Sequence, residues 1–143
     1  MLKQTTQVAE IERELRMIAG IIKQKGRVLL KEFEITPPQF IALQWLSEEG
    51  DMTIGELSAK MYLAFSTTTD LVDRMEKNEL VRRVRDENDR RVVRIHLLPI
   101  GLELIEKVID RRQKYLQDIF DHFSQEEVDN LENSLRLLYQ HMN

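Results

Sequence analysis

The basic side chains of this chain are concentrated in one segment, where guanidinium and ammonium groups could bind phosphate oxygens. The 143 residues include 21 Lys and Arg against 25 Asp and Glu, a formal net charge of −4. Residues 74–94, by contrast, hold eight basic and five acidic residues. A locally positive segment in an acidic chain indicates contact with a polyanion, because each neutralised phosphate releases counterions.

The sequence lacks the residue patterns of catalysis and of metal binding. It has no Cys, which excludes a disulfide framework, a thiolate metal site, a cysteine nucleophile and a thiol redox switch. His96, His122 and His141 do not have the spacing of a metal site. Neither a Gly-rich phosphate loop nor a G-x-S-x-G motif occurs. We therefore expect no catalytic residue, no metal, no cofactor and no enzyme activity.

The two ends of the chain carry apolar residues in a heptad pattern, which predicts long helices with narrow apolar stripes. The stripes are Val8, Ile11, Leu15, Ile18, Ile22 and Leu29, then Leu98, Leu102, Ile105, Ile109, Leu116, Ile119 and Phe123, then Val128, Leu131, Leu135, Leu138 and Met142. Ser124 and Glu127 form a capping box that starts the last helix. One protomer cannot bury three such stripes, so we expect a homodimer. The predicted interface residues are Ile11, Leu15, Ile18, Leu116, Ile119, Phe123, Leu131, Leu135 and Leu138.

The middle of the chain predicts three shorter helices and a hairpin. Thr36 and Gln39 form a capping box for the first helix, which ends at Gly50, and Thr53 and Glu56 form a second box for a helix to about residue 60. The third helix buries Thr68, Leu71, Val72 and Met75, so Ser66, Thr67, Asp70, Asp73, Arg74 and Lys77 point outward, with Thr69 at the margin. After residue 78 the apolar period changes to two. That change predicts a two-stranded hairpin, Val81–Val84 with Val93–Leu97, joined by a turn at residues 86–89.

This order of elements is that of a winged helix-turn-helix. We expect a fold that is mainly α with a small β-hairpin wing, in a single domain over residues 1–143. Residues 36–97 would form the winged helix-turn-helix module, and residues 1–35 and 98–143 the dimerisation helices. The acidic N-terminal residues and the absence of a long apolar run predict neither a signal peptide nor a membrane span, so we expect a cytoplasmic protein with no membrane partner.

The stretch from Thr36 to Gly101 resembles the MarR family of bacterial transcription regulators. The resemblance rests on Thr36, Gln39 and Phe40, on LVDRME at residues 71–76, on LVRR at residues 80–83, on Asp86-x-x-Asp89-Arg90-Arg91, and on Ile95-x-Leu97 before Gly101. The terminal heptads match the family's dimerisation region. Three features depart from the family pattern. Glu79 stands where the family often has Gly, so Asn78 is expected to take the left-handed conformation. Leu98 stands where Thr is usual. Ala64 replaces a frequent Ser cap, and Asp70 replaces a residue that is often basic or neutral.

The resemblance implies a regulator that binds a pseudo-palindromic site in double-stranded DNA as a homodimer. The third helix would enter the major groove with Ser66, Thr67, Thr69 and Asp70, because short polar side chains can approach base edges and phosphates. At the hairpin tip, Asp89 would brace an Arg91 that enters the minor groove. Arg74, Arg83 and Arg90 complete the predicted DNA contacts. The competing interpretations are a solvated helix face and an ordinary turn.

The sequence also leaves room for a ligand and for a different function. Phe33, Trp45, Tyr62 and Phe65 could line a cavity for a small aromatic or lipophilic effector where the long helices meet the module, although aromatic residues at helical spacing more often form core. Without a thiol, release from DNA should depend on such a ligand. We expect repression of a nearby promoter. The alternative is a winged-helix module that binds a protein partner through its heptad helices, without useful DNA affinity.

Overall fold

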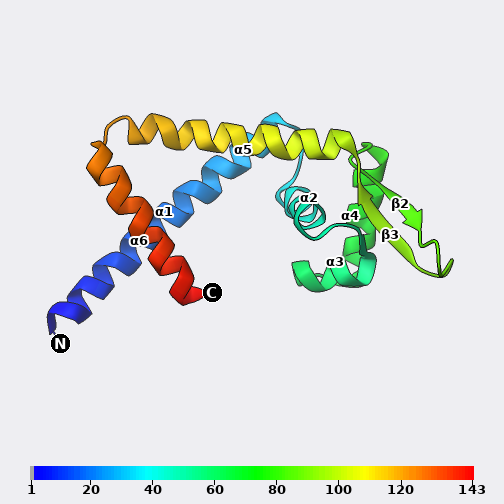
Figure 1. The fold of residues 1–143 in the computed structure, drawn as a ribbon, viewed down its shortest axis with the longest axis horizontal. Helices are drawn as coiled ribbons and strands as arrows, with labels where there is room; N and C mark the ends of the chain where they lie inside the picture. Colours follow the sequence, from blue (N-terminus) through cyan, green and yellow to red (C-terminus); the bar gives the residue numbers. More distant parts are fainter. Residues whose placement is uncertain (1) are drawn as a thin grey trace. The chain divides into compact units, whose positions relative to one another are not determined.

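The computed structural model describes the backbone of residues 2–143 and the side chains from Thr5 onward. In this range the elements follow the chain as α1 (Leu2–Glu32), α2 (Pro37–Glu49), β1 (Met52–Thr53), α3 (Ile54–Met61), α4 (Phe65–Lys77), β2 (Val81–Arg85), β3 (Val93–Leu97), α5 (Pro99–Phe120) and α6 (Gln125–Met142) (Figure 1). The expected fold class, mainly α with a small β wing, is confirmed. Among the described residues, no helix has the length and apolar character that crossing a membrane requires.

The chain forms two compact units, Met1–Val108 and Ile109–Asn143. The first unit holds α1, the module and the start of α5, and the second holds the rest of α5 together with α6. Phe123 was expected on the same helix as Leu116, but α5 ends at Phe120 and Phe123 lies in the turn before α6. Its ring packs edge-on against that of Phe120, with 5.6 Å between the ring centroids, so the two rings shape the turn.

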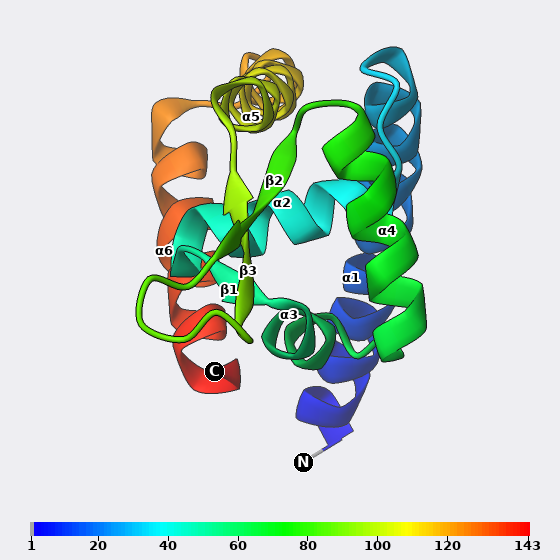
Figure 2. The same ribbon diagram turned by 90° about the vertical axis from the view of Figure 1, so that its right-hand side faces the viewer.

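The wing is part of a three-stranded antiparallel sheet with the order β1-β3-β2 (Figure 2). The expected two-stranded hairpin is therefore incomplete, because Met52 and Thr53 pair with Ile95 and Arg94 on the other edge of β3. A strand of two residues is too short to show a period of two, so the sequence pattern could not reveal it. The hairpin loop also extends over residues 86–92 rather than ending at residue 89. We call β2, β3 and this loop the wing.

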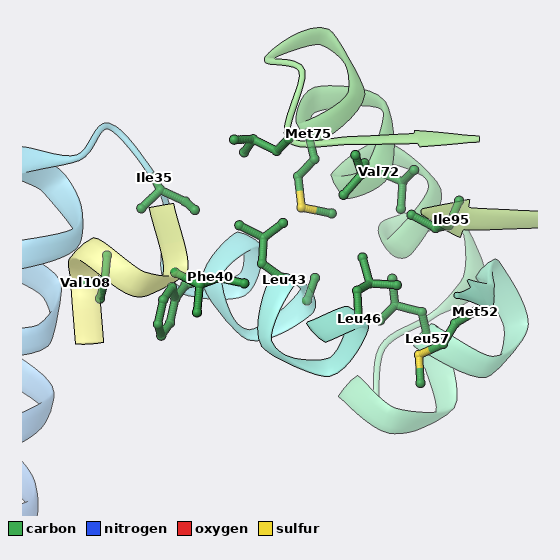
Figure 3. Close-up of a cluster of buried hydrophobic side chains, with 14 of the residues drawn as sticks. Ile35, Phe40, Leu43, Leu46, Met52, Leu57, Val72, Met75, Ile95 and Val108 are labelled. Atoms are coloured by element: carbon green, nitrogen blue, oxygen red, sulfur yellow. The ribbon is translucent and has the colours of Figure 1, made fainter. Parts of the chain in front are cut away.

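The hydrophobic core of the module surrounds α2 (Figure 3). Phe40, Leu43 and Leu46 form the buried face of α2. The other elements contribute Leu57 from α3, Val72 and Met75 from α4, Val81 and Ile95 from the sheet, and Ile105 and Val108 from α5. Of the predicted inner face of α4, Thr68, Val72 and Met75 are buried and Leu71 is half-buried against the core. Burial of that face fixes which side chains α4 presents to solvent.

Most of the predicted helix starts are confirmed. Thr36 Oγ1 accepts from the Gln39 N–H at 3.3 Å, and Gln39 Oε1 accepts from the Thr36 N–H at 3.0 Å. The box at Ser124 and Glu127 is complete as well, and its hydrogen bonds with Ser124 hold the pKa of Glu127 below its ordinary value. At Thr53 only half of the expected box forms. Thr53 Oγ1 accepts from the Glu56 N–H, but the Glu56 carboxylate accepts from the Thr53 hydroxyl instead of the backbone N–H.

Three helices end in a left-handed residue that is not glycine. Glu34, Tyr62 and Glu79 have φ values of 57°, 55° and 61°. After each of them, the next N–H bonds back to a carbonyl five residues earlier, as from Leu80 to Met75 at 3.0 Å. This pattern of main-chain bonds is the Schellman motif. The expectation that Asn78 would take the left-handed conformation is wrong, because Asn78 has φ −89° and Glu79 makes the turn.

Three elements, α4, β2 and α5, meet at Leu80, and we call this place the Leu80 joint. Its N–H closes the end of α4, its side chain is buried, and β2 begins at Val81. Its carbonyl oxygen accepts from the Leu98 N–H at 3.0 Å, just before α5. A Cβ at Gly101 would lie against this same oxygen, closer than real Cβ atoms approach, and 2.7 Å from Leu97 Cδ1. Only glycine allows the first turn of α5 to pass so near to the start of the wing.

We expect Gly101→Ala to destabilise the fold by about 1 to 3 kcal/mol, because the added methyl group must displace backbone at the Leu80 joint. Thermal and urea unfolding of the purified variant measure this change. Gly55→Ala is the matched control, since Gly55 also lies in the first turn of a helix and its Cβ would meet only Thr53 Oγ1 at 3.9 Å. Equal stability of the two variants would contradict the role given to Gly101.

Candidate nucleic-acid interface

The outer face of α4 presents the polar residues that the sequence analysis selected. Ser66, Thr67, Asp70 and Arg74 are exposed, and Thr69 is half-buried. The Thr69 hydroxyl donates to the Phe65 carbonyl at 3.0 Å, which leaves its oxygen lone pairs as acceptors. The face therefore offers short hydroxyl groups toward the N-terminal end of α4 and a guanidinium toward its C-terminal end.

The N-terminal end of α4 has no side-chain cap. Ala64 is the N-cap residue, and no side chain accepts a hydrogen bond from the first turn. The backbone N–H groups of a first helical turn have no partner within the helix, and the helix dipole places partial positive charge there. Such an end can bind a phosphate oxygen, so replacing the usual Ser cap by Ala favours a ligand in the place of the cap.

At the wing tip, Asp89 and Arg91 form the ion pair expected from the sequence. Asp89 Oδ1 accepts from the Arg91 backbone N–H and from Nε, both at 3.1 Å, and Oδ2 accepts from Nη2 at 3.2 Å. These bonds to Arg91 lower the pKa of Asp89, so the carboxylate stays ionised at neutral pH. The Arg91 side chain is nevertheless 90% exposed. Asp89 thus orients a guanidinium that remains open to a ligand.

A second carboxylate, which the sequence analysis placed only in the turn, holds the loop together. Asp86 Oδ2 accepts from the N–H groups of Asn88 and Asp89 at 3.1 and 3.0 Å, and Oδ1 accepts from Arg94 Nε at 3.3 Å. Arg94 is the first cause of the lowered pKa of Asp86, followed by the two backbone bonds. The signal was available in the sequence, because an Asp that starts a turn commonly binds backbone N–H groups two and three residues later.

Arg83, which was expected to contact DNA, bonds to two carboxylates of α4. Its Nη1 donates to Glu76 Oε1 at 2.8 Å, its Nη2 donates to Asp73 Oδ1 at 2.6 Å, and its backbone N–H donates to Glu76 Oε2 at 2.8 Å. Partial burial disfavours the charged form, but the hydrogen bonds to the two carboxylates outweigh it and raise the pKa of Arg83. Arg83 therefore fixes α4 against β2.

Two further side-chain contacts tie β3 to neighbouring segments. Arg94 Nη1 lies 3.6 Å from Glu56 Oε1 on α3, and His96 Nδ1 lies 2.8 Å from Asp51 Oδ1.

In Figure 2 the N-terminal end of α4, helix α3 and the wing loop lie at the lower end of the module, away from the start of α5. The wing loop, which contains Arg91, and the uncapped N-terminal end of α4 thus lie at one end of the module.

The four aromatic residues proposed for a ligand cavity lie in different surroundings. Phe33 lines a cavity of about 360 Å³. Trp45 is half-buried with Lys60 Nζ 5.0 Å above its ring, whereas Tyr62 and Phe65 are 94% and 64% exposed. The cavity is lined by Phe33, Glu34, Ile35, Asn78, Leu80, Ile100, Glu103, Leu104 and Lys107, all in the first unit. It borders the Leu80 joint.

The terminal stripes remain largely uncovered within one protomer. Of the predicted interface residues, the exposed ones are Ile11, Leu15, Ile18, Leu116, Phe123, Leu135 and Leu138, and the half-buried ones are Ile119 and Leu131. Helix α6 has no buried residue. Exposed apolar surface on this scale marks an interaction surface.

Among the side chains that the structure describes, no group of three or more His, Asp or Glu residues is placed to hold a metal ion.

Comparisons with known proteins agree with this geometry. The family model of the MarR family matches residues 35–93. A Bacillus subtilis protein named as the uncharacterized HTH-type transcriptional regulator YsmB is 64% identical over 135 residues, which are 94% of this chain and 92% of the relative. The HTH-type transcriptional repressor IacR of Pseudomonas putida is 27% identical over 128 residues, which are 90% of this chain and 77% of that protein.

Solved structures give the same result. A MarR family protein from Bacillus stearothermophilus is 60% identical with a TM-score of 0.86, and the match covers 95% of both chains. A complex of Staphylococcus aureus MepR with DNA is 25% identical with a TM-score of 0.72, and the match covers 90% of this chain and 96% of MepR. With this identity along nearly its whole length, the chain belongs to the MarR family and is a DNA-binding transcriptional regulator of the winged helix-turn-helix type.

Proposed function

We propose that the chain is a homodimeric repressor that holds α4 and the wing of each protomer against a pseudo-palindromic site in double-stranded DNA. The observation that carries the proposal is the Arg91 side chain, oriented by Asp89 and 90% exposed, at the same end of the module as the uncapped start of α4. The name of the relative IacR supports repression. A repressor of this kind blocks a promoter by occupying it.

In this proposal α4 lies in the major groove. Ser66 and Thr67 approach base edges and phosphates, and the acceptor oxygen of Thr69 lies at the edge of the same face. Asp70 accepts from the amino group of a cytosine, which is the base group that matches a carboxylate in this groove. Arg74 neutralises a phosphate.

The wing supplies a second contact. Arg91 enters the minor groove, whose negative potential is strongest where the groove is narrow, and Arg90 binds the adjacent DNA backbone. Arg83 acts through α4: its bonds to Asp73 and Glu76 hold the helix at a fixed place relative to the wing. We therefore assign Arg83 a positioning role and not a contact with DNA.

Selection of bound sequences from random duplex DNA by the purified protein tests the proposal directly. The expected result is an inverted repeat whose half-sites lie roughly one helical turn apart, about 34 to 36 Å. Affinity for the selected duplex should fall steeply from low to moderate salt, because phosphate contacts release counterions. No enriched sequence and no salt-dependent binding would contradict the proposal and favour the protein-interaction module.

Arg91→Ala should weaken binding to the selected duplex by about 1 to 3 kcal/mol if the side chain fills the minor groove. The fold should be intact, because the guanidinium is exposed and bonded only within its own loop. Fluorescence anisotropy with labelled duplex measures the loss. Arg90→Ala is the comparison and should cost less, with similar losses for all sequences. If both variants bind as tightly as the parent, the wing contact is wrong.

The proposed dimer predicts a strong effect of a charge in the apolar stripe of α6. Leu135→Asp should give a folded chain of monomeric mass in sedimentation at micromolar concentration, because the carboxylate would be buried in the interface. Leu137→Asp is the matched control, since Leu137 is equally apolar and exposed but lies on another face of α6. A parent protein that sediments as a folded monomer would defeat the prediction.

The cavity beside the Leu80 joint supports release by a small aromatic or lipophilic effector. Its apolar walls include Phe33, Ile35 and Leu104, and a ligand there would alter the path from α1 and α5 into the module. Titration of aromatic carboxylates and lipophilic compounds into the protein–DNA complex should displace the duplex. Leu104→Trp, which fills the cavity, should retain DNA binding and lose this response, whereas Ile41→Trp should keep both. Release by peroxide without any ligand would contradict the scheme.

A further inference from the structure

Two aromatic side chains are exposed at the turn between α3 and α4. Among residues 36–97, all of which the structure describes, the exposed large hydrophobic side chains are Ile41, Tyr62 and Phe65. Tyr62 is 94% exposed and Phe65 is 64% exposed, and they are separated by only two residues. Neither belongs to the terminal stripes of α1, α5 and α6. Their exposure therefore calls for a partner other than the second protomer.

The backbone holds Tyr62 in a conformation that aromatic residues seldom adopt. Its φ of 55° lies in the left-handed region, and the bond from the Leu63 N–H to the Ser58 carbonyl at 3.1 Å closes the turn around it. A bulky residue is strained in this region, and strained residues are often found at binding sites. Tyr62 thus projects its ring from the turn that leads into α4.

Phe65 has the position from which a recognition helix reaches base edges. It is the first residue of α4, directly before Ser66 and Thr67, and Cβ atoms of a helix point toward its N-terminus. The N-terminal residues of a recognition helix are those that contact bases. In the major groove the one apolar group on a base edge is the C5-methyl of thymine, and a Phe side chain is an apolar partner for it.

We propose that Phe65 contacts the C5-methyl group of a thymine in the major groove, while the Tyr62 ring packs beside it on the sugar–phosphate backbone. The Tyr62 hydroxyl then donates to a phosphate oxygen, a contact that carries no sequence information. This inference rests on the proposed placement of α4 in DNA and adds to it a preference for thymine at one position of each half-site.

Replacement of single thymines by deoxyuridine tests the contact, because deoxyuridine differs only by lacking the methyl group. With the parent protein, replacement at the contacted position of the selected duplex should weaken binding by about threefold to fivefold, the effect of one buried methyl group. Phe65→Ala should weaken binding to the thymine duplex at least as much and should no longer distinguish thymine from deoxyuridine. Tyr62→Phe should weaken binding to both duplexes by the same factor.

Ile41→Ala is the matched control, since it removes apolar surface from α2, where Ile41 is 44% exposed. It should keep the affinity of the parent and the preference for thymine. Thermal unfolding verifies that each variant is folded. A Phe65→Ala variant that retains the parent's preference for thymine would overturn the proposal and leave the aromatic pair to a protein partner. A parent that binds no duplex would instead overturn the proposed function, and this inference with it.

Discussion

The close approach of α5 to the Leu80 carbonyl is the constraint on which the rest of the module depends. One residue ends α4, starts β2 and accepts the hydrogen bond that precedes α5. The absence of a side chain at Gly101 allows this approach. Because α4 ends and β2 begins at this joint, main-chain geometry sets the distance between the two elements here, and the bonds from Arg83 to Asp73 and Glu76 hold them together. The cavity lined by Phe33 and Leu104 borders the same residue, so a molecule bound there would act where the spacing is determined.

Charge has two separate tasks in this module. The half-buried Arg83 bonds to Asp73 and Glu76 and holds the elements together, whereas exposed groups such as Arg91 remain for the ligand. Asp86 and Asp89 lower the net charge of the wing, yet they keep the loop in one conformation and orient the guanidinium. A preorganised cation loses less conformational entropy on binding than a free one. A chain of net charge −4 can therefore have a surface that suits phosphate.

The sequence was sufficient for features that depend on local patterns. In the capping boxes at Thr36 and Ser124, the inner face of α4 and the Asp89–Arg91 pair, each residue is at most four positions from the next one in the pattern. It was insufficient where distant segments meet. The pairing of Met52 with Ile95 and the bonds from Arg83 to α4 depend on tertiary structure, so neither periodicity nor charge counting could reveal them. The left-handed conformation was expected at Asn78, because Asn adopts positive φ more readily than Glu. In the structure Glu79 adopts it, because the hydrogen bond from the Leu80 N–H to the Met75 carbonyl closes the turn around Glu79.

The helix ends at Glu34, Tyr62 and Glu79 have a consequence for how such a regulator diverges. Each turn is closed by main-chain bonds, so the closure itself does not depend on which side chain the left-handed residue carries. Duplicated genes could therefore drift at these three sites while the scaffold stays constant. At residue 62 that drift would change a side chain beside the start of α4, so paralogues could come to differ in their affinity for DNA while the module keeps its fold.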